Sequence, residues 1–117
     1  MSLSALPHDE RQIIGAILDA ALSRGLRVSV YDGEEWALTG SDSRPAIAAE
    51  VGATDCTTLR FRDPARLDER GKPASVGSVF LVHGNGCDVI GDYSDNPATA
   101  GLLAPALAVA DRLSVVA

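Results

Sequence analysis

Hydrophobic residues recur at helical spacing near both ends of the chain. The first such stretch follows Pro7 and stops at Gly25, since proline favours the first turn of a helix and glycine its end. Asn96 and Pro97 open the second stretch as an N-cap and a first helical residue. Pro105 within it predicts a kink or a separate first turn, because proline lacks the backbone donor. The predicted buried stripes are Ile14, Ile17, Leu18, Ala21 and Leu22 in the first helix, and Leu103, Ala106, Leu107, Ala110 and Leu113 in the last.

Between these helices hydrophobic and polar residues alternate with a period of two, which is typical of half-buried strands. Strands are predicted over residues 26–31, 36–39, 57–63, 76–83 and 87–92. The fourth of these is apolar on both faces, which indicates a central strand. Asp32-Gly33 and Gly84-Asn85-Gly86 supply tight turns, the latter through positive φ angles. A short helix over residues 44–51, closed by Gly52, separates the second and third strands.

The element order is therefore α-β-β-α-β-β-β-α in a single domain over residues 1–117. Short hairpin connections predict an α+β fold with a mostly antiparallel five-stranded sheet and helices packed mainly on one face. Residues 64–75 are mixed in charge and contain Gly71-Lys72-Pro73, so we expect an exposed, flexible loop there, with Pro64 ending the preceding strand. The predicted inner face carries Val28, Val30, Trp36, Leu38, Leu59 and Phe61, and the open face carries Arg27, Tyr31, Thr39, Thr58, Arg60, Arg62 and Phe80.

Charge and composition narrow the classes of partner. Ten basic and sixteen acidic residues give a net charge of −6, which disfavours general nucleic-acid binding unless a local patch reverses the field. The apolar stretch over residues 13–22 is interrupted by Asp19 and preceded by charged residues, which predicts neither a signal peptide nor a membrane span and favours a cytoplasmic location. Cys56 and Cys87 lie far apart without a metal-binding spacing, and we expect both to be reduced.

Several strings in the chain form a set: residues 28–36 (VSVYDGEEW), Thr54-Asp55, residues 58–63 (TLRFRD), Gly77, Gly84-Asn85-Gly86 and residues 92–96 (DYSDN). This set resembles a group of small, uncharacterised proteins of phages and prophage-like regions of bacteria, and the resemblance covers most of the chain. The chain differs from the group by its longer stretch after Pro64 and by His83 and Cys87. The group has no assigned activity, cofactor or catalytic residue, so the resemblance implies only an accessory protein of the bacterial cytoplasm that acts on a host protein.

The open face of the sheet is the first candidate site. It mixes aromatic side chains with arginine, which suits contact with another protein, although an antiparallel sheet can also simply leave a polar face in solvent. The acidic turn at residues 32–35 can equally present carboxylates to a basic partner or serve solubility. The protein-binding candidates are Tyr31, Asp32, Glu34, Arg60, Arg62 and Phe80. A second copy of the chain is the alternative occupant of this face.

Other readings of function remain open at this point. Asp88, Asp92 and Asp95 could gather around a divalent cation or serve a hydrolase, but capping of the last helix explains Asp95 without a metal. His83 and Cys87 face each other across a predicted turn, with no third group to orient them, so we assign no catalytic residue and no cofactor. A partner protein in a toxin–antitoxin or immunity pair also fits the acidity. The leading prediction is a non-enzymatic protein-interaction or modulator protein.

Overall fold

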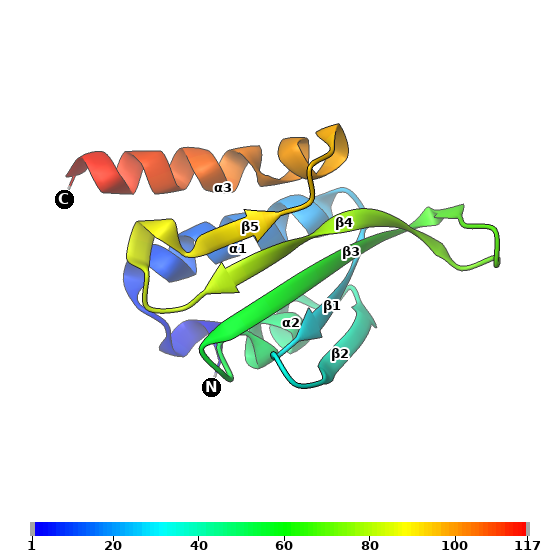
Figure 1. Ribbon diagram of the computed structural model, residues 1–117, viewed down its shortest axis with the longest axis horizontal. Coiled ribbons are helices and arrows are strands. Elements are labelled where there is room, and N and C mark those ends of the chain that lie inside the picture. The colour runs from blue at the N-terminus through cyan, green and yellow to red at the C-terminus, as the bar shows by residue number, and fades with distance from the viewer. Residues whose placement is uncertain (1, 117) are drawn as a thin grey trace.

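The computed structural model describes residues 2–116 and confirms the predicted order of three α-helices and five strands. Two short 3₁₀ helices, η1 and η2, accompany them (Figure 1). The elements are η1 (Leu3–Ala5), α1 (His8–Ser23), β1 (Arg27–Tyr31), β2 (Trp36–Ser41), α2 (Arg44–Glu50), β3 (Cys56–Leu67), β4 (Pro73–Val82), η2 (Gly86–Asp88), β5 (Ile90–Tyr93) and α3 (Pro97–Val116).

The five strands form one antiparallel sheet in the order β2-β1-β3-β4-β5. The long β3–β4 hairpin lies at its centre. Opposed residues share a face, so the pairs Val30 with Leu59 and Leu59 with Val79 place one continuous apolar row on the inner side. This register confirms the predicted division of β1 and β3 into an inner and an open face.

All three helices cover the inner side of the sheet. In Figure 1, α1 and α2 lie behind the strands and α3 runs alongside α1. The sheet contributes Val28, Val30, Leu59, Phe61, Val79 and Leu81 to the core, and the helices contribute Ile13, Ile14, Ile17, Leu18, Ala21, Ile47, Leu102, Leu103 and Ala106. Within residues 2–116 no helix lies on the opposite side of the sheet, so that face is open to solvent.

The start of α3 is anchored on β4. Asn96 caps the helix by accepting a hydrogen bond from the backbone N–H of Thr99 at 2.8 Å, as predicted. The side chains of Asn96 and Thr99 both donate to the carbonyl of Val76. At Gly77 an added Cβ would lie 2.1 Å from the Thr99 hydroxyl, so glycine permits this close approach. The helix contains Pro105 as an interior residue, and no separate turn precedes it.

One strand prediction is wrong in a way that matters for function. Trp36 was expected in the core, but it lies on the open face with 41% of its surface exposed. The register shifts between the pairs Val30–Leu38 and Tyr31–Trp36, so that β2 carries one extra residue, Ala37. Because successive strand residues point to opposite faces, this bulge places Leu38 inward and Trp36 outward.

Two boundaries also differ from the predictions. Pro64 does not end its strand; β3 continues to Leu67 and pairs with β4, with an irregular register between Asp63 and Leu67. The segment expected as a loop is thus the outer part of a hairpin. The last strand begins at Ile90 rather than at Cys87, because η2 occupies residues 86–88.

Candidate functional site: the open face of the sheet

The protein-binding candidates of the open face lie in two rows across the sheet. Tyr31, Thr58 and Phe80 are opposed residues of β1, β3 and β4, and Arg60 faces Ser29 in the neighbouring row. Phe80 is 40% exposed and Tyr31 is half-buried. The open face therefore displays the aromatic and basic side chains that alternation along the strands predicted.

Trp36, Tyr31 and Arg60 pack together on this face. The Arg60 guanidinium lies 4.4 Å from the centre of the Trp36 ring, and the Tyr31 ring is 5.1 Å from it at a tilt of 58°. A cation over an aromatic ring at an exposed site is worth about 0.5–1 kcal/mol. These contacts hold Arg60 in place beside Trp36, which forms the wall at one end of a groove.

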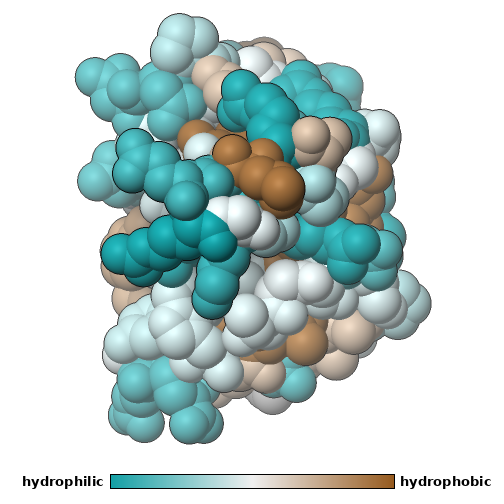
Figure 2. Space-filling view, turned by 90° about the vertical axis from the view of Figure 1, so that its right-hand side faces the viewer, coloured by the Kyte–Doolittle hydropathy of each residue, from teal (hydrophilic) through white to brown (hydrophobic). Residues whose placement is uncertain are grey.

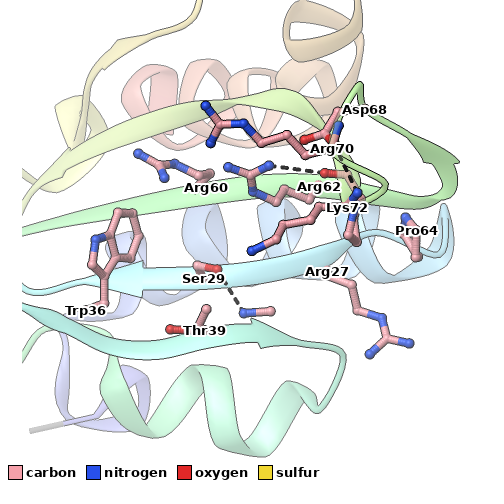
Figure 3. Close-up of a pocket in the computed structure, with 12 residues that line it drawn as sticks. Arg27, Ser29, Trp36, Thr39, Arg60, Arg62, Pro64, Asp68, Arg70 and Lys72 are labelled. Carbon is pink, nitrogen blue, oxygen red and sulfur yellow. Dashed lines mark hydrogen bonds between the residues drawn. The ribbon is translucent and has the colours of Figure 1, made fainter.

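The groove has a volume of about 670 Å³ and lies between β2 and the outer part of the β3–β4 hairpin. Figure 3 shows that its side chains come from β1, β2, β3 and the hairpin turn, with Lys72 reaching back from the turn over the sheet. The lining residues used below are Arg27, Trp36, Arg60, Arg62, Asp68, Arg70 and Lys72. Five of the ten basic residues of the chain line this groove, but one of the sixteen acidic residues does. A strongly basic patch thus exists on an acidic protein.

Most of these cations have no carboxylate partner. Arg27 lies 3.9 Å from Asp42, with both side chains exposed. Within residues 2–116, Arg60, Arg62, Arg70 and Lys72 make no ion pair. Their charges are therefore free to attract an anion that enters the groove.

The basic end of the groove depends on a tight turn at the tip of the hairpin. One carboxylate oxygen of Asp68 accepts hydrogen bonds from the backbone N–H groups of Arg70 and Lys72, at 2.8 and 3.0 Å. These bonds, helped by the nearby charges of Arg62 and Lys72, lower the pKa of Asp68. Arg62 donates to the carbonyl of Pro73. The turn thus fixes the backbones of Arg70 and Lys72, while the charged ends of their side chains make no ion pair with the described residues.

The end of the tip is mostly hydrophilic. Figure 2 looks onto it and shows charged and polar side chains over much of the surface, with a hydrophobic patch among them. Leu67, which is 66% exposed, belongs to this part of the hairpin. The tip therefore offers apolar as well as charged contacts.

Asp32 and Glu34 lie at the other end of the sheet, in the β1–β2 turn. Asp32 accepts hydrogen bonds from the backbone N–H groups of Glu34 and Glu35, both at 2.8 Å, which lower its pKa. The Thr54 hydroxyl donates to the Asp32 carbonyl and ties the turn to the segment before β3. The Asp32 carboxylate therefore serves the turn, while Glu34 and Glu35 remain exposed.

The structure does not bring Asp88, Asp92 and Asp95 together. Asp88 belongs to η2, Asp92 opposes Phe80 on the open face, and Asp95 precedes α3. The predicted strand over residues 87–92 would place Asp88 and Asp92 on one face, since residues four apart in a strand point to the same side. This prediction is wrong, because the strand starts only at Ile90. Among the described residues no three His, Cys, Asp or Glu side chains lie close enough to hold a metal ion.

His83 belongs to a buried polar cluster rather than to a thiol site. Its Nε2 lies 2.7 Å from the Thr57 hydroxyl and its Nδ1 lies 3.6 Å from the Glu10 carboxylate. Glu10 is 1% exposed and accepts a hydrogen bond from the backbone N–H of Gly84. Burial lowers the pKa of His83, although Glu10 and, more weakly, Asp55 act in the opposite direction.

Both cysteines are free, and the surroundings of Cys87 do not favour a thiolate. The Cys87 thiol lies 3.7 Å from a carboxylate oxygen of Asp9. Desolvation and this neighbouring negative charge raise the pKa of Cys87, so the thiol stays protonated at neutral pH. His83 is turned to Thr57 and Glu10 instead.

Sequence reasoning missed Trp36, Arg70 and Lys72 as residues of the groove. Trp36 was misplaced by the bulge in β2, for which the sequence carries no clear mark. Arg70 and Lys72 follow an aspartate and flank a glycine, a combination typical of a tight turn. That pattern, together with Arg60 and Arg62 on the adjoining strand, could have indicated a basic hairpin.

No protein-family model matches the chain, and no curated protein or solved structure is significantly similar to it. Pro97–Val115 of α3 is long and apolar enough to cross a membrane by length and composition alone. Core helices share this property, and Leu102, Leu103 and Ala106 of α3 are fully buried here. The geometry of the open face is therefore the main guide to function.

Proposed function

We propose that this protein acts by binding another protein through the open face of its sheet. The observation that carries the proposal is the gathering of unpaired cations around an exposed tryptophan on the one face that no helix covers. Aromatic residues and arginine are the residue types most enriched at the centres of protein interfaces. The face combines both, with Tyr31, Trp36 and Phe80 beside Arg60 and Arg62.

The resemblance to phage and prophage-associated proteins leads us to propose a bacterial cytoplasmic protein as the partner. In this proposal the protein modulates its target by occupying a surface and carries out no chemical step. The site needs no cofactor, because arginine, lysine and aromatic side chains supply the contacts directly.

Capture from a bacterial lysate tests the proposal. The native protein is compared with a variant that combines Tyr31→Ala, Arg60→Glu and Phe80→Ser, all on the open face. The matched control carries Arg112→Glu and Val115→Ser on the exposed surface of α3. Thermal unfolding verifies that all three proteins are folded.

The expected result is one protein retained by the native form and the control but lost by the open-face variant. The purified partner should then co-elute with the native protein in gel filtration. A partner that is retained equally by the open-face variant, or lost only with the α3 control, would contradict the proposal.

A further inference from the structure

The two ends of the open face carry opposite charge. The groove end holds Arg27, Arg60, Arg62, Arg70 and Lys72, and the β1–β2 turn at the other end holds Glu34 and Glu35. Asp92 lies in the same cross-strand row as Tyr31, but on the far edge strand β5. A surface divided in this way discriminates among ligands, since a chain of uniform negative charge is attracted by one end and repelled by the other. The negative charge of the partner must therefore lie at the basic end and must not extend along the whole face.

We infer that the groove binds a short, extended acidic segment of a partner protein, with an aromatic or apolar residue of that segment packed against Trp36. This inference rests on the proposed function and names the chemistry of its partner. The carboxylates of the segment lie among Arg62, Arg70 and Lys72, and its apolar residue lies at the Trp36 end.

Carboxylates suit the basic side chains of this groove. The planar guanidinium of arginine presents paired N–H donors that match the two oxygens of a carboxylate, and such charge-assisted bonds are stronger than neutral ones. Asp68 fixes the backbones of Arg70 and Lys72, so the turn loses less conformational entropy when a ligand binds. The Asp68 carboxylate is itself engaged by these backbone N–H groups.

The dimensions of the face fit a short peptide. Arg60 and Pro64 both line the groove and lie four residues apart on β3, which corresponds to about 13 Å. About four or five extended residues span that length. The volume of about 670 Å³ is also in the range of sites that enclose a few side chains.

A single-stranded nucleic acid fits less well. A strand that continued past Trp36 would bring its phosphates against Glu34 and Glu35 of the β1–β2 turn. A peptide with a local run of carboxylates avoids this repulsion.

Fluorescence of Trp36 provides a direct test, because it is the one tryptophan of the chain. The first probe is a tryptophan-free peptide of about eight residues that combines glutamates with one phenylalanine, long enough to span the groove. The second is the same peptide with glutamine in place of glutamate. A thymidine oligonucleotide and inorganic phosphate are the third and fourth probes, and calorimetry repeats each titration independently of fluorescence.

The acidic peptide should change the Trp36 emission in a saturable manner and bind at least about ten-fold more tightly than the glutamine peptide. Arg70→Gln with Lys72→Gln should weaken it by about ten-fold as well, since two cations are lost while the backbone hydrogen bonds of the turn remain. Arg112→Gln on α3 is the matched control and should leave the affinity unchanged. Rising salt should weaken the acidic peptide and leave the glutamine peptide unaffected.

Five outcomes would overturn the inference. Tighter binding of the oligonucleotide would assign the groove to nucleic acid, equal binding of phosphate would assign it to a small anion, and equal binding of both peptides would remove the charge requirement. Concentration-dependent dimerisation that disappears in Arg70→Gln/Lys72→Gln would assign the groove to a second copy of the chain. If a captured partner depends on Tyr31 and Phe80 but not on Arg70 and Lys72, this inference fails while the proposed function stands.

Discussion

The β1–β2 turn and the β3–β4 turn are built in the same way, but the residues whose backbones bond to the aspartate carry opposite charge. In each, one aspartate carboxylate accepts two backbone N–H groups of the turn: Asp32 from Glu34 and Glu35, Asp68 from Arg70 and Lys72. Such side-chain bonds to the local backbone are a common way of closing a turn. Each turn also contains a glycine with a positive φ angle, Gly33 in the first and Gly71 in the second. The geometry requires the aspartate and this glycine, so the other residues of the turn are free to vary in charge.

The difference between the turns therefore concerns binding and not folding. Glu34 and Glu35 add negative charge to one end of the open face, while Arg70 and Lys72 add positive charge to the other. Changing these four side chains should alter what the face attracts and leave the fold intact. The predictions below test that separation, beginning with the largest effect.

The largest expected effect is on the affinity for an acidic peptide, when the charged residues of the turns are exchanged. We expect Arg70→Glu with Lys72→Glu to weaken binding of an acidic peptide by about 100-fold or more, because attraction becomes repulsion. Glu34→Lys with Glu35→Lys should strengthen it several-fold by extending the basic surface. Calorimetric titration measures both. Unchanged melting temperatures would show that the body of the sheet is intact, and unchanged hydrogen exchange at the turn amides would show that both turns still form. Equal affinity in all variants would remove charge as the difference between the turns.

Replacing each aspartate by alanine should change the stability of the two turns to different extents. This effect is smaller than the effect of the charge exchange on binding. Asp32→Ala should lower the melting temperature by a few degrees. The β1–β2 turn is continuous with the body of the sheet and is tied by Thr54 to the segment before β3, so loosening it affects the whole fold. Asp68→Ala should leave the melting temperature nearly unchanged and speed hydrogen exchange at the amides of Arg70 and Lys72, because the tip protrudes and opens locally. A large fall in melting temperature for Asp68→Ala would contradict this assignment.

The pH dependence of stability should come from neither turn. The lowered pKa values of Asp32 and Asp68 mean that both carboxylates stay ionised until the pH falls well below 5, so their stabilising bonds are lost only in stronger acid. His83 should instead dominate in weak acid. Its pKa is lower in the folded protein than the ordinary value of 6.5, so the unfolded chain takes up the proton first.

Stability should therefore be full above about pH 6.5 and decline as the pH falls below it, through the titration of His83. The size of this decline is the smallest effect predicted here. Glu10 and Asp55, which face His83, limit it by favouring the charged ring. Chemical denaturation at pH 7.5 and pH 5.5 measures the decline, and His83→Gln should flatten it. An unchanged slope in that variant would assign the pH dependence to another group.

The fold could be predicted because the alternation of hydrophobic residues, the turn residues and the helix caps all indicated the same elements. Val28 and Val30 alternate with Arg27 and Tyr31, and the partner strand repeats the pattern with Leu59 and Phe61. The structure keeps this alternation because a shift by one residue would move the buried side chains of a strand to its solvent face. The residues of the open face could be predicted from the same alternation.

The groove itself could not be predicted, because it depends on non-local geometry. Trp36 reaches the open face only through a bulge, and Arg70 and Lys72 reach it only because β3 continues past Pro64. Glu10, in the first turn of α1, lies on the same helical face as Ile13, Ile14 and Ile17 and is buried with them. Its spacing of three, four and seven residues from these isoleucines was the available sign.

The bond between Glu10 and Gly84 has a consequence for how the chain folds during synthesis. It joins residues 74 positions apart, so the first helix leaves the ribosome long before its buried carboxylate can meet its partner. Until the turn after β4 emerges, the helix must keep this charged group in water with its apolar stripe unpaired. Completion of the core is therefore postponed until β5 and α3, which follow this turn, have been synthesised and cover the remaining surface.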